Sequence, residues 1–134
     1  MNYDRGNVIE KRGIVFKDEF TPDPMGKHPA MIAIAVSEDN NYMYFLTLTS
    51  QVDKYFEYPI NKERYFLIKS NEYNRLKKTS LVNLLNIYKE PVSNEYPVAF
   101  IQEYEYKKLI KQFVRWQEST SSPDEYYREL KPLL

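Results

Sequence analysis

The chain has 134 residues, 19 basic and 19 acidic side chains, and no cysteine. This length fits one domain, residues 1–134, and is long enough to bury a core. The absence of cysteine excludes disulfides and thiolate metal sites, and a single histidine, His28, excludes a zinc site built from several imidazoles. A net charge of zero argues against a dedicated duplex-DNA binder, which normally carries a basic excess.

The hydropathy pattern gives no sign of membrane insertion or secretion. The N-terminal residues are polar, and the longest apolar run, Ala30–Val36, is far shorter than the ~20 residues of a membrane span. We therefore expect a soluble, cytoplasmic protein that does not associate with membranes.

The first two thirds of the chain predict strands. Residues 12–17 form the first of these, and a loop rich in proline follows over 20–29. Ala30–Val36 is apolar throughout, which is typical of a strand buried on both faces. After a polar turn, Tyr42–Thr49 is aromatic and β-branched, so the two segments predict a hairpin. Further strands are expected over 64–68 and 80–88.

The last third predicts helices. Side chains that suit one helix face recur at three- and four-residue spacing over 103–118: Tyr106, Leu109, Ile110, Phe113, Val114 and Gln117. Residues 119–122 end this helix. Ser122, Pro123 and Glu125 then suit the start of a short final helix, which should reach about Lys131 and place Tyr126, Tyr127 and Leu130 inward. Strands followed by helices indicate a mainly β (α+β) fold, a small barrel or curved sheet capped by helices.

Several short segments, taken in order, carry a resemblance to a known family. They are Arg-Gly-Ile-Val-Phe over 12–16, Asp-Glu-Phe-Thr-Pro over 18–22, Lys-His-Pro-Ala-Met-Ile over 27–32, Leu-Thr-Leu-Thr-Ser-Gln over 46–51 and Leu-Lys-Lys-Thr-Ser-Leu-Val-Asn-Leu over 76–84. Together they resemble the MazF/PemK toxin endoribonucleases over residues 12–118, with 119–134 as a helical extension. The resemblance implies an SH3-like small barrel with C-terminal helices.

The resemblance also implies a site. Members of the family cut single-stranded RNA without a metal or other cofactor, and the attacking group is the 2′-hydroxyl of the RNA. Thr49 takes the position of the family's threonine, and His28 takes that of its catalytic arginine. An imidazole, with an ordinary pKa of about 6.5, exchanges protons near neutral pH but lacks the bidentate grip of arginine on phosphate. Lys27, Ser50 and Gln51 are the neighbouring candidates for binding substrate.

A basic segment extends the candidate binding surface. Its cations are Lys69, Arg75, Lys77 and Lys78, and Tyr73 lies among them. Cations interleaved with an aromatic ring suit an RNA strand. A solvated loop is the alternative.

The resemblance implies partners as well. Family members are homodimers, and a protein antitoxin blocks their RNA groove, so we expect a homodimer, a cognate antitoxin and a single-stranded RNA substrate.

Two other readings stay open. One is a related toxin that is neutralised by RNA. The other is a catalytically inactive barrel that serves as a protein- or RNA-binding module, which the replacement of arginine by His28 would suit. In that case His28 is an ordinary loop residue, and Thr49 makes only local backbone hydrogen bonds at a strand end.

Overall fold

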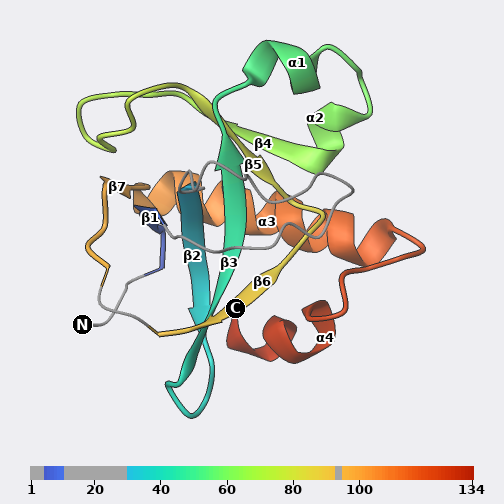
Figure 1. Cartoon of the computed structure of the whole chain (residues 1–134). Coiled ribbons are helices and arrows are strands. Elements are labelled where there is room, and N and C mark those ends of the chain that lie inside the picture. The colour runs from blue at the N-terminus through green and yellow to red at the C-terminus, as the bar shows by residue number, and fades with distance from the viewer. Residues whose placement is uncertain (1–4, 11–29, 93–94) are drawn as a thin grey trace, which may run out of the picture.

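The computed structural model describes residues 5–10, 30–92 and 95–134, so the strand expected over 12–17 lies outside the described residues. Within the described part, seven strands form one antiparallel sheet in the order β4-β5-β3-β2-β1-β7, and β6 pairs with β3 off this path (Figure 1). The strands are β1 (Asn7–Glu10), β2 (Ala30–Val36), β3 (Tyr42–Thr49), β4 (Tyr65–Ile68), β5 (Ser80–Asn83), β6 (Tyr88–Pro91) and β7 (Ala99–Phe100).

The predicted hairpin of β2 and β3 is confirmed and lies at the centre of the sheet. Its register runs from Ala30 opposite Leu48 to Val36 opposite Met43, with a shift between Ala33 and Ala35. Five consecutive residues of β2 are fully buried, as the continuous apolar run predicts. Alternate residues therefore pack on opposite faces of the sheet, in two separate core clusters.

β3 changes partner along its length, and this curls the sheet. Its N-terminal half pairs with β6, from Tyr42 to Phe45, whereas Leu48 and Thr49 pair with β5. The single strand expected over 80–88 is thus wrong, because residues 84–87 turn away between β5 and β6. The fold is a mostly antiparallel sheet that forms a curled half-barrel with a few helices (Figure 1).

A buried glutamine accounts for this turn. The Gln117 side-chain amide donates to the carbonyl of Leu84 at 2.7 Å, and its oxygen accepts from the backbone N–H of Asp124 at 2.8 Å. Asp124 in turn accepts from the backbone N–H of Ile87 at 3.0 Å. The carbonyl of Leu84 and the N–H of Ile87 are therefore satisfied by residues more than 30 positions away.

The helix predicted over 103–118 is α3 (Glu103–Ser119), and it crosses behind the sheet in Figure 1. Leu109 and Phe113 are fully buried and join the larger core cluster, with Ile34 of β2 and Leu46 of β3 among its members. Two short helices, α1 (Val52–Phe56) and α2 (Asn61–Arg64), connect β3 to β4. None of the helices within the described ranges combines the length and the hydropathy required to cross a bilayer.

The final helix, α4 (Tyr127–Leu130), is shorter than expected and continues as a 3-10 turn, η1 (Lys131–Leu133). Tyr127 and Leu130 are buried as predicted, whereas Tyr126 is only half-buried. The expected cap is wrong: no side chain caps α4, and the carboxylate of Asp124 accepts from the backbone N–H of Tyr126 at 2.9 Å.

Candidate functional site

Thr49 is the last residue of β3, where it is half-buried and opposite Leu81 of β5. Its hydroxyl oxygen accepts a hydrogen bond from the backbone N–H of Gln51 at 3.2 Å, the local bond expected at a strand end. Within the described residues the structure gives the hydroxyl hydrogen no acceptor. Ser50 and Gln51 follow and are exposed. The segment therefore presents one hydroxyl donor and two further polar side chains at the edge of the fold.

The basic segment is the connection between β4 and β5, residues 69–79, here called the β4–β5 loop. Two asparagines fold it. The side chain of Asn71 accepts from the backbone N–H of Tyr73 and of Asn74, each at 2.9 Å. These are the Asx turns that asparagine forms in loops. The predicted basic segment is thus an ordered loop with its own internal hydrogen bonds.

Asn74 anchors this loop to the fold. Its side chain is 2% exposed, donates to the carbonyl of Lys69 at 2.9 Å, and accepts from the backbone N–H of Leu76 at 3.0 Å. Its backbone carbonyl accepts from the N–H of Phe100 in β7 at 2.9 Å. One buried side chain therefore joins both limbs of the loop, and its main chain holds the loop against the sheet.

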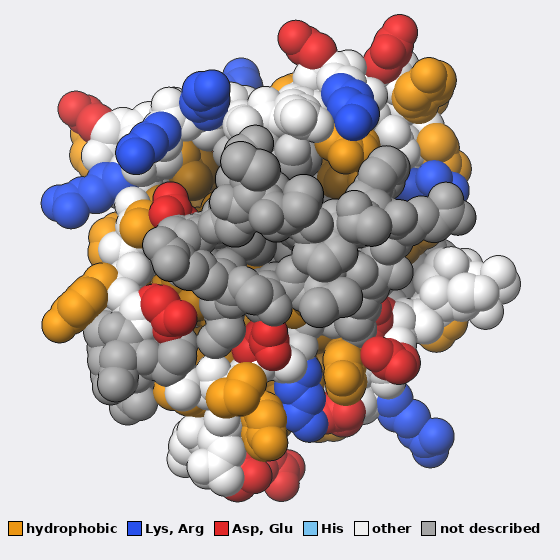
Figure 2. Space-filling view, viewed as in Figure 1, with side chains coloured by type: hydrophobic (Ala, Val, Ile, Leu, Met, Phe, Trp, Pro, Cys, Tyr) orange, Lys and Arg blue, Asp and Glu red, His pale blue; other side chains and the backbone are white. Residues whose placement is uncertain are grey.

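The cations of the loop point outward. Lys69, Arg75, Lys77 and Lys78 are all exposed. Figure 2 shows Lys and Arg side chains gathered at the upper left, over the β4–β5 loop, with an acidic side chain among them. Glu72 is the acidic residue of the loop, so four positive charges and one negative charge leave this segment at +3 in a chain whose net charge is zero.

The strand register brings the two predicted segments to one end of the sheet. Thr49 is opposite Leu81, and Ser80 is opposite Ile68, the residue that precedes the loop. The polar segment that follows β3 and both ends of the β4–β5 loop therefore leave the sheet side by side, at the upper end in Figure 1. Lys27 and His28 lie outside the described residues, so their position relative to Thr49 stays a prediction.

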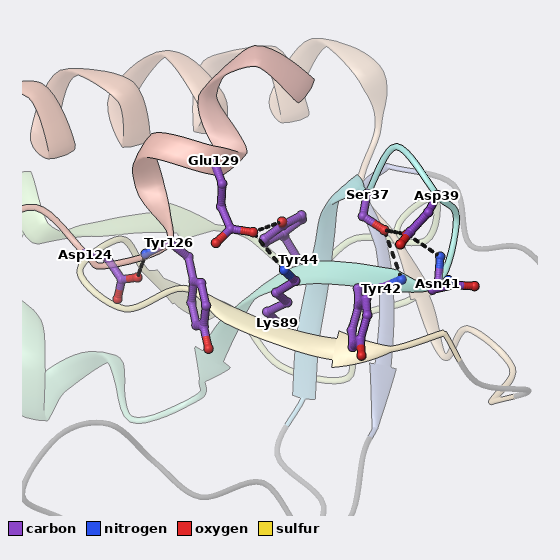
Figure 3. A network of polar contacts seen from close by, with 9 residues as sticks. All are labelled: Ser37, Asp39, Asn41, Tyr42, Tyr44, Lys89, Asp124, Tyr126 and Glu129. Carbon is purple, nitrogen blue, oxygen red and sulfur yellow. Dashed lines mark hydrogen bonds and ion pairs between the residues drawn. The ribbon is translucent and has the colours of Figure 1, made fainter.

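A second polar cluster was not found from the sequence. The carboxylate of Glu129 in α4 accepts from the hydroxyl of Tyr44 at 2.5 Å and from the ammonium of Lys89 at 2.8 Å (Figure 3). The Lys89 nitrogen also lies 5.1 Å from the ring centre of Tyr42 and 6.0 Å from that of Tyr126. An ammonium among aromatic faces is a cation–π arrangement.

The charges of this cluster follow from its hydrogen bonds. Lys89 and then Tyr44 lower the pKa of Glu129, and the bond to Glu129 raises the pKa of Lys89. Desolvation and then the carboxylate raise the pKa of Tyr44. At neutral pH these shifts favour a charged Glu129 carboxylate, a charged Lys89 ammonium and an uncharged Tyr44 phenol. Fixed charge states suit an attachment of α4 to β3 and β6 rather than proton transfer.

A similar set joins the two C-terminal helices. Glu118 of α3 accepts from the hydroxyl of Tyr127 at 2.7 Å and pairs with Lys131 at 2.8 Å. Desolvation and the bond to Glu118 raise the pKa of Tyr127. Both clusters are built from residues already engaged with one another, so neither offers a free catalytic group.

No model of a known protein family matches the chain, and no curated protein matches it. In the described part of the chain, no three acidic or histidine side chains come together to hold a metal ion. The hydroxyl of the half-buried Thr49 and the basic β4–β5 loop make the arrangement with the clearest chemical use, which is to hold a phosphate chain.

Proposed function

We propose that the protein is a metal-independent endoribonuclease that cleaves single-stranded RNA by attack of the 2′-hydroxyl on the neighbouring phosphate. The observation that carries the proposal is the convergence of Thr49–Gln51 and the β4–β5 loop at one end of the sheet. Cleavage of a phosphodiester is promoted by a hydrogen-bond donor to its non-bridging oxygen, and binding of the strand is promoted by cations along its backbone. The first requirement is met by Thr49, and the second by Lys77, Lys78 and their neighbours.

The proposed mechanism divides the work between two residues. Thr49 donates from its hydroxyl to a non-bridging oxygen, where negative charge grows as the phosphorane forms. The 2′-oxygen forms a bond to phosphorus as the bond from phosphorus to the 5′-oxygen breaks, which leaves a 2′,3′-cyclic phosphate and a 5′-hydroxyl. His28 takes the proton of the 2′-hydroxyl and returns a proton to the departing 5′-oxygen, because an imidazole titrates close to neutral pH. Lys27 and the cations of the loop balance the charge, and Ser50 and Gln51 position the strand.

The biological setting follows from the resemblance to the MazF/PemK family. The proposal includes an SH3-like barrel, a homodimer, a cytoplasmic location and a role as the toxin of a toxin–antitoxin pair. The curled antiparallel sheet and the closing helix α3 are compatible with such a barrel.

The test is cleavage of a long RNA in EDTA by the protein, by Thr49→Val and by His28→Ala. Valine keeps the shape of threonine and removes the hydroxyl. Thr120→Val is the matched control, because Thr120 accepts from the backbone N–H two residues later, at 3.3 Å, as Thr49 does at 3.2 Å. We expect kcat to fall by about 100-fold or more for Thr49→Val, the scale of losing one transition-state donor, and to stay unchanged for Thr120→Val.

Two outcomes would contradict the proposal. Intact RNA at high concentrations of the wild-type protein would remove the enzymatic activity. Equal cleavage by Thr49→Val and the wild type would remove Thr49 from the mechanism.

A further inference from the structure

A strip of exposed apolar side chains leads into the edge strand β7. Tyr96 is 79% exposed, Val98 47% and Phe100 40%, whereas Ala99 and Ile101 between and after them are buried. This alternation is that of an extended chain with one face on the core and the other facing outward. Phe100 is thus an aromatic side chain presented on the surface by the sheet itself.

The β4–β5 loop crosses β7 at this point. The backbone N–H of Phe100 donates to the carbonyl of Asn74 at 2.9 Å, and the guanidinium carbon of Arg75 lies 5.9 Å from the centre of the Phe100 ring. Tyr73, the preceding exposed ring of the loop, is 69% exposed. Figure 1 shows the loop lying above β7 at the upper left. The buried Asn74 is therefore flanked in the sequence by two planar groups, the phenol of Tyr73 and the guanidinium of Arg75.

The loop holds Arg75 in a conformation that arginine seldom adopts. Its φ is +60°, in the left-handed region, which costs a residue other than glycine about 1–2 kcal/mol. The backbone N–H of Arg75 donates to the carbonyl of Asn71 at 3.3 Å, and Leu76, the next residue, is tied to Asn74. The backbone of Arg75 is thus fixed by its neighbours, and backbone strain of this kind is concentrated at functional sites.

The chemistry of this surface favours a single-stranded nucleic acid. Unpaired bases stack on tyrosine rings and on guanidinium planes, and lysines follow the phosphates. The loop carries a net charge of +3, and lysine is depleted from protein–protein interfaces. A protein partner would therefore suit the exposed rings but not Lys77 and Lys78 beside them.

We propose that Tyr73 and Arg75, the latter backed by the Phe100 ring, are two stacking platforms for unpaired RNA bases, with Lys77 and Lys78 on the adjoining phosphates. The inference rests on the proposed function, since it takes RNA as the ligand. It adds the side chains that hold the unpaired bases, which the proposed function leaves unassigned.

The experiment measures binding separately from cleavage. A fluorescent, uniformly 2′-O-methylated 12-nucleotide RNA of mixed sequence cannot be cut by 2′-hydroxyl attack, and anisotropy gives its Kd. Arg75→Lys keeps the charge and removes the plane, and Arg115→Lys, an exposed arginine of α3, is its control. Tyr73→Ala and Tyr73→Phe separate loss of the ring from loss of the hydroxyl, and Tyr58→Ala, 60% exposed, is the control for an exposed tyrosine.

We expect Arg75→Lys and Tyr73→Ala each to weaken binding about 5-fold or more, the scale of one lost stacked base. Tyr73→Phe, Arg115→Lys and Tyr58→Ala should bind as the wild type does. The same RNA annealed to its complement should bind more weakly than the single strand.

Equal affinities for Arg75→Lys, Tyr73→Ala and the wild type would overturn the inference and leave the loop as a purely electrostatic contact. Absence of RNA binding by the wild type, with self-association that Phe100→Ala abolishes, would overturn it and assign the strip to a second copy of the chain. If the stacking pattern appears but natural RNA is never cut, the nuclease proposal fails and this one stands. If natural RNA is cut but Arg75→Lys and Tyr73→Ala bind as the wild type does, the stacking proposal fails and the nuclease proposal stands.

Discussion

Replacing Asn74 by alanine should loosen the β4–β5 loop without removing any of its charges or rings. The change deletes three side-chain hydrogen bonds: to the carbonyl of Lys69 at 2.9 Å, and from the backbone N–H groups of Leu76 at 3.0 Å and Asn71 at 3.2 Å. Each such bond contributes about 0.5–1.5 kcal/mol net. Because the exposed backbone at Asn71 can bind water instead, we expect the free energy of unfolding to fall by about 2–3 kcal/mol.

Urea denaturation followed by the fluorescence of Trp116 measures this change, and hydrogen exchange at the Leu76 amide reports on the loop alone. Asn86→Ala is the control, since Asn86 is half-buried and the structure gives its side chain no hydrogen bond with any described residue. We expect the control to lose less than about 0.5 kcal/mol. If the free energy of unfolding of Asn74→Ala lies within that margin of the wild-type value, and the Leu76 amide hydrogen exchanges as slowly as in the wild type, the loop is not held by Asn74.

Three further predictions concern the β5–β6 turn, the backbone at Arg75 and the contacts of Glu129. Gln117→Met should lower the free energy of unfolding by about 2–4 kcal/mol in urea, because it leaves buried backbone groups of the β5–β6 turn unpaired; no loss would contradict the assigned network. Arg75→Gly should be more stable than Arg75→Ala by about 0.5–1 kcal/mol, since both lose the guanidinium but only glycine adopts a positive φ without strain; equal urea midpoints would refute this. The pKa of Glu129 is lowered on folding, so its contribution to the free energy of unfolding is complete above about pH 4.5 and is lost as the pH falls through the folded value. The thermal unfolding midpoint should therefore fall less steeply with decreasing pH in Glu129→Gln than in the wild type. An equal fall in both would show that other carboxylates cause it.

The sequence predicts the parts of this fold that depend on local patterns. The continuous apolar run of β2 and the aromatic and β-branched run of β3 appear with the expected bounds, and α3 ends one residue beyond its prediction. β4 begins one residue late because Arg64 closes α2. In each case the side-chain period and the flanking turn residues suffice to define the element.

The parts that were missed depend on distant contacts. β1 and β7, of four and two residues, lack the run of aromatic and aliphatic residues that marks β4, and they exist because they pair with β2 and with each other. The turn between β5 and β6 is made by Gln117 and Asp124, which no local pattern in 80–88 reveals.

The candidate site, too, could be predicted from the sequence only where its signal is local. Basic and aromatic residues in one short segment mark the β4–β5 loop from sequence alone, but the role of Asn74 as its anchor depends on a burial that only the fold shows. The Lys89–Glu129–Tyr44 cluster joins residues 40 and 85 positions apart, so it leaves no signal in the sequence.

That cluster also bears on which part of the fold opens first. The sheet register alone places Tyr44 opposite Lys89. The carboxylate that both share comes from α4, 85 and 40 positions away along the chain. Local opening of α4 should therefore leave β3 and β6 paired, and the backbone amides of α4 should exchange hydrogen with solvent faster than those of β3.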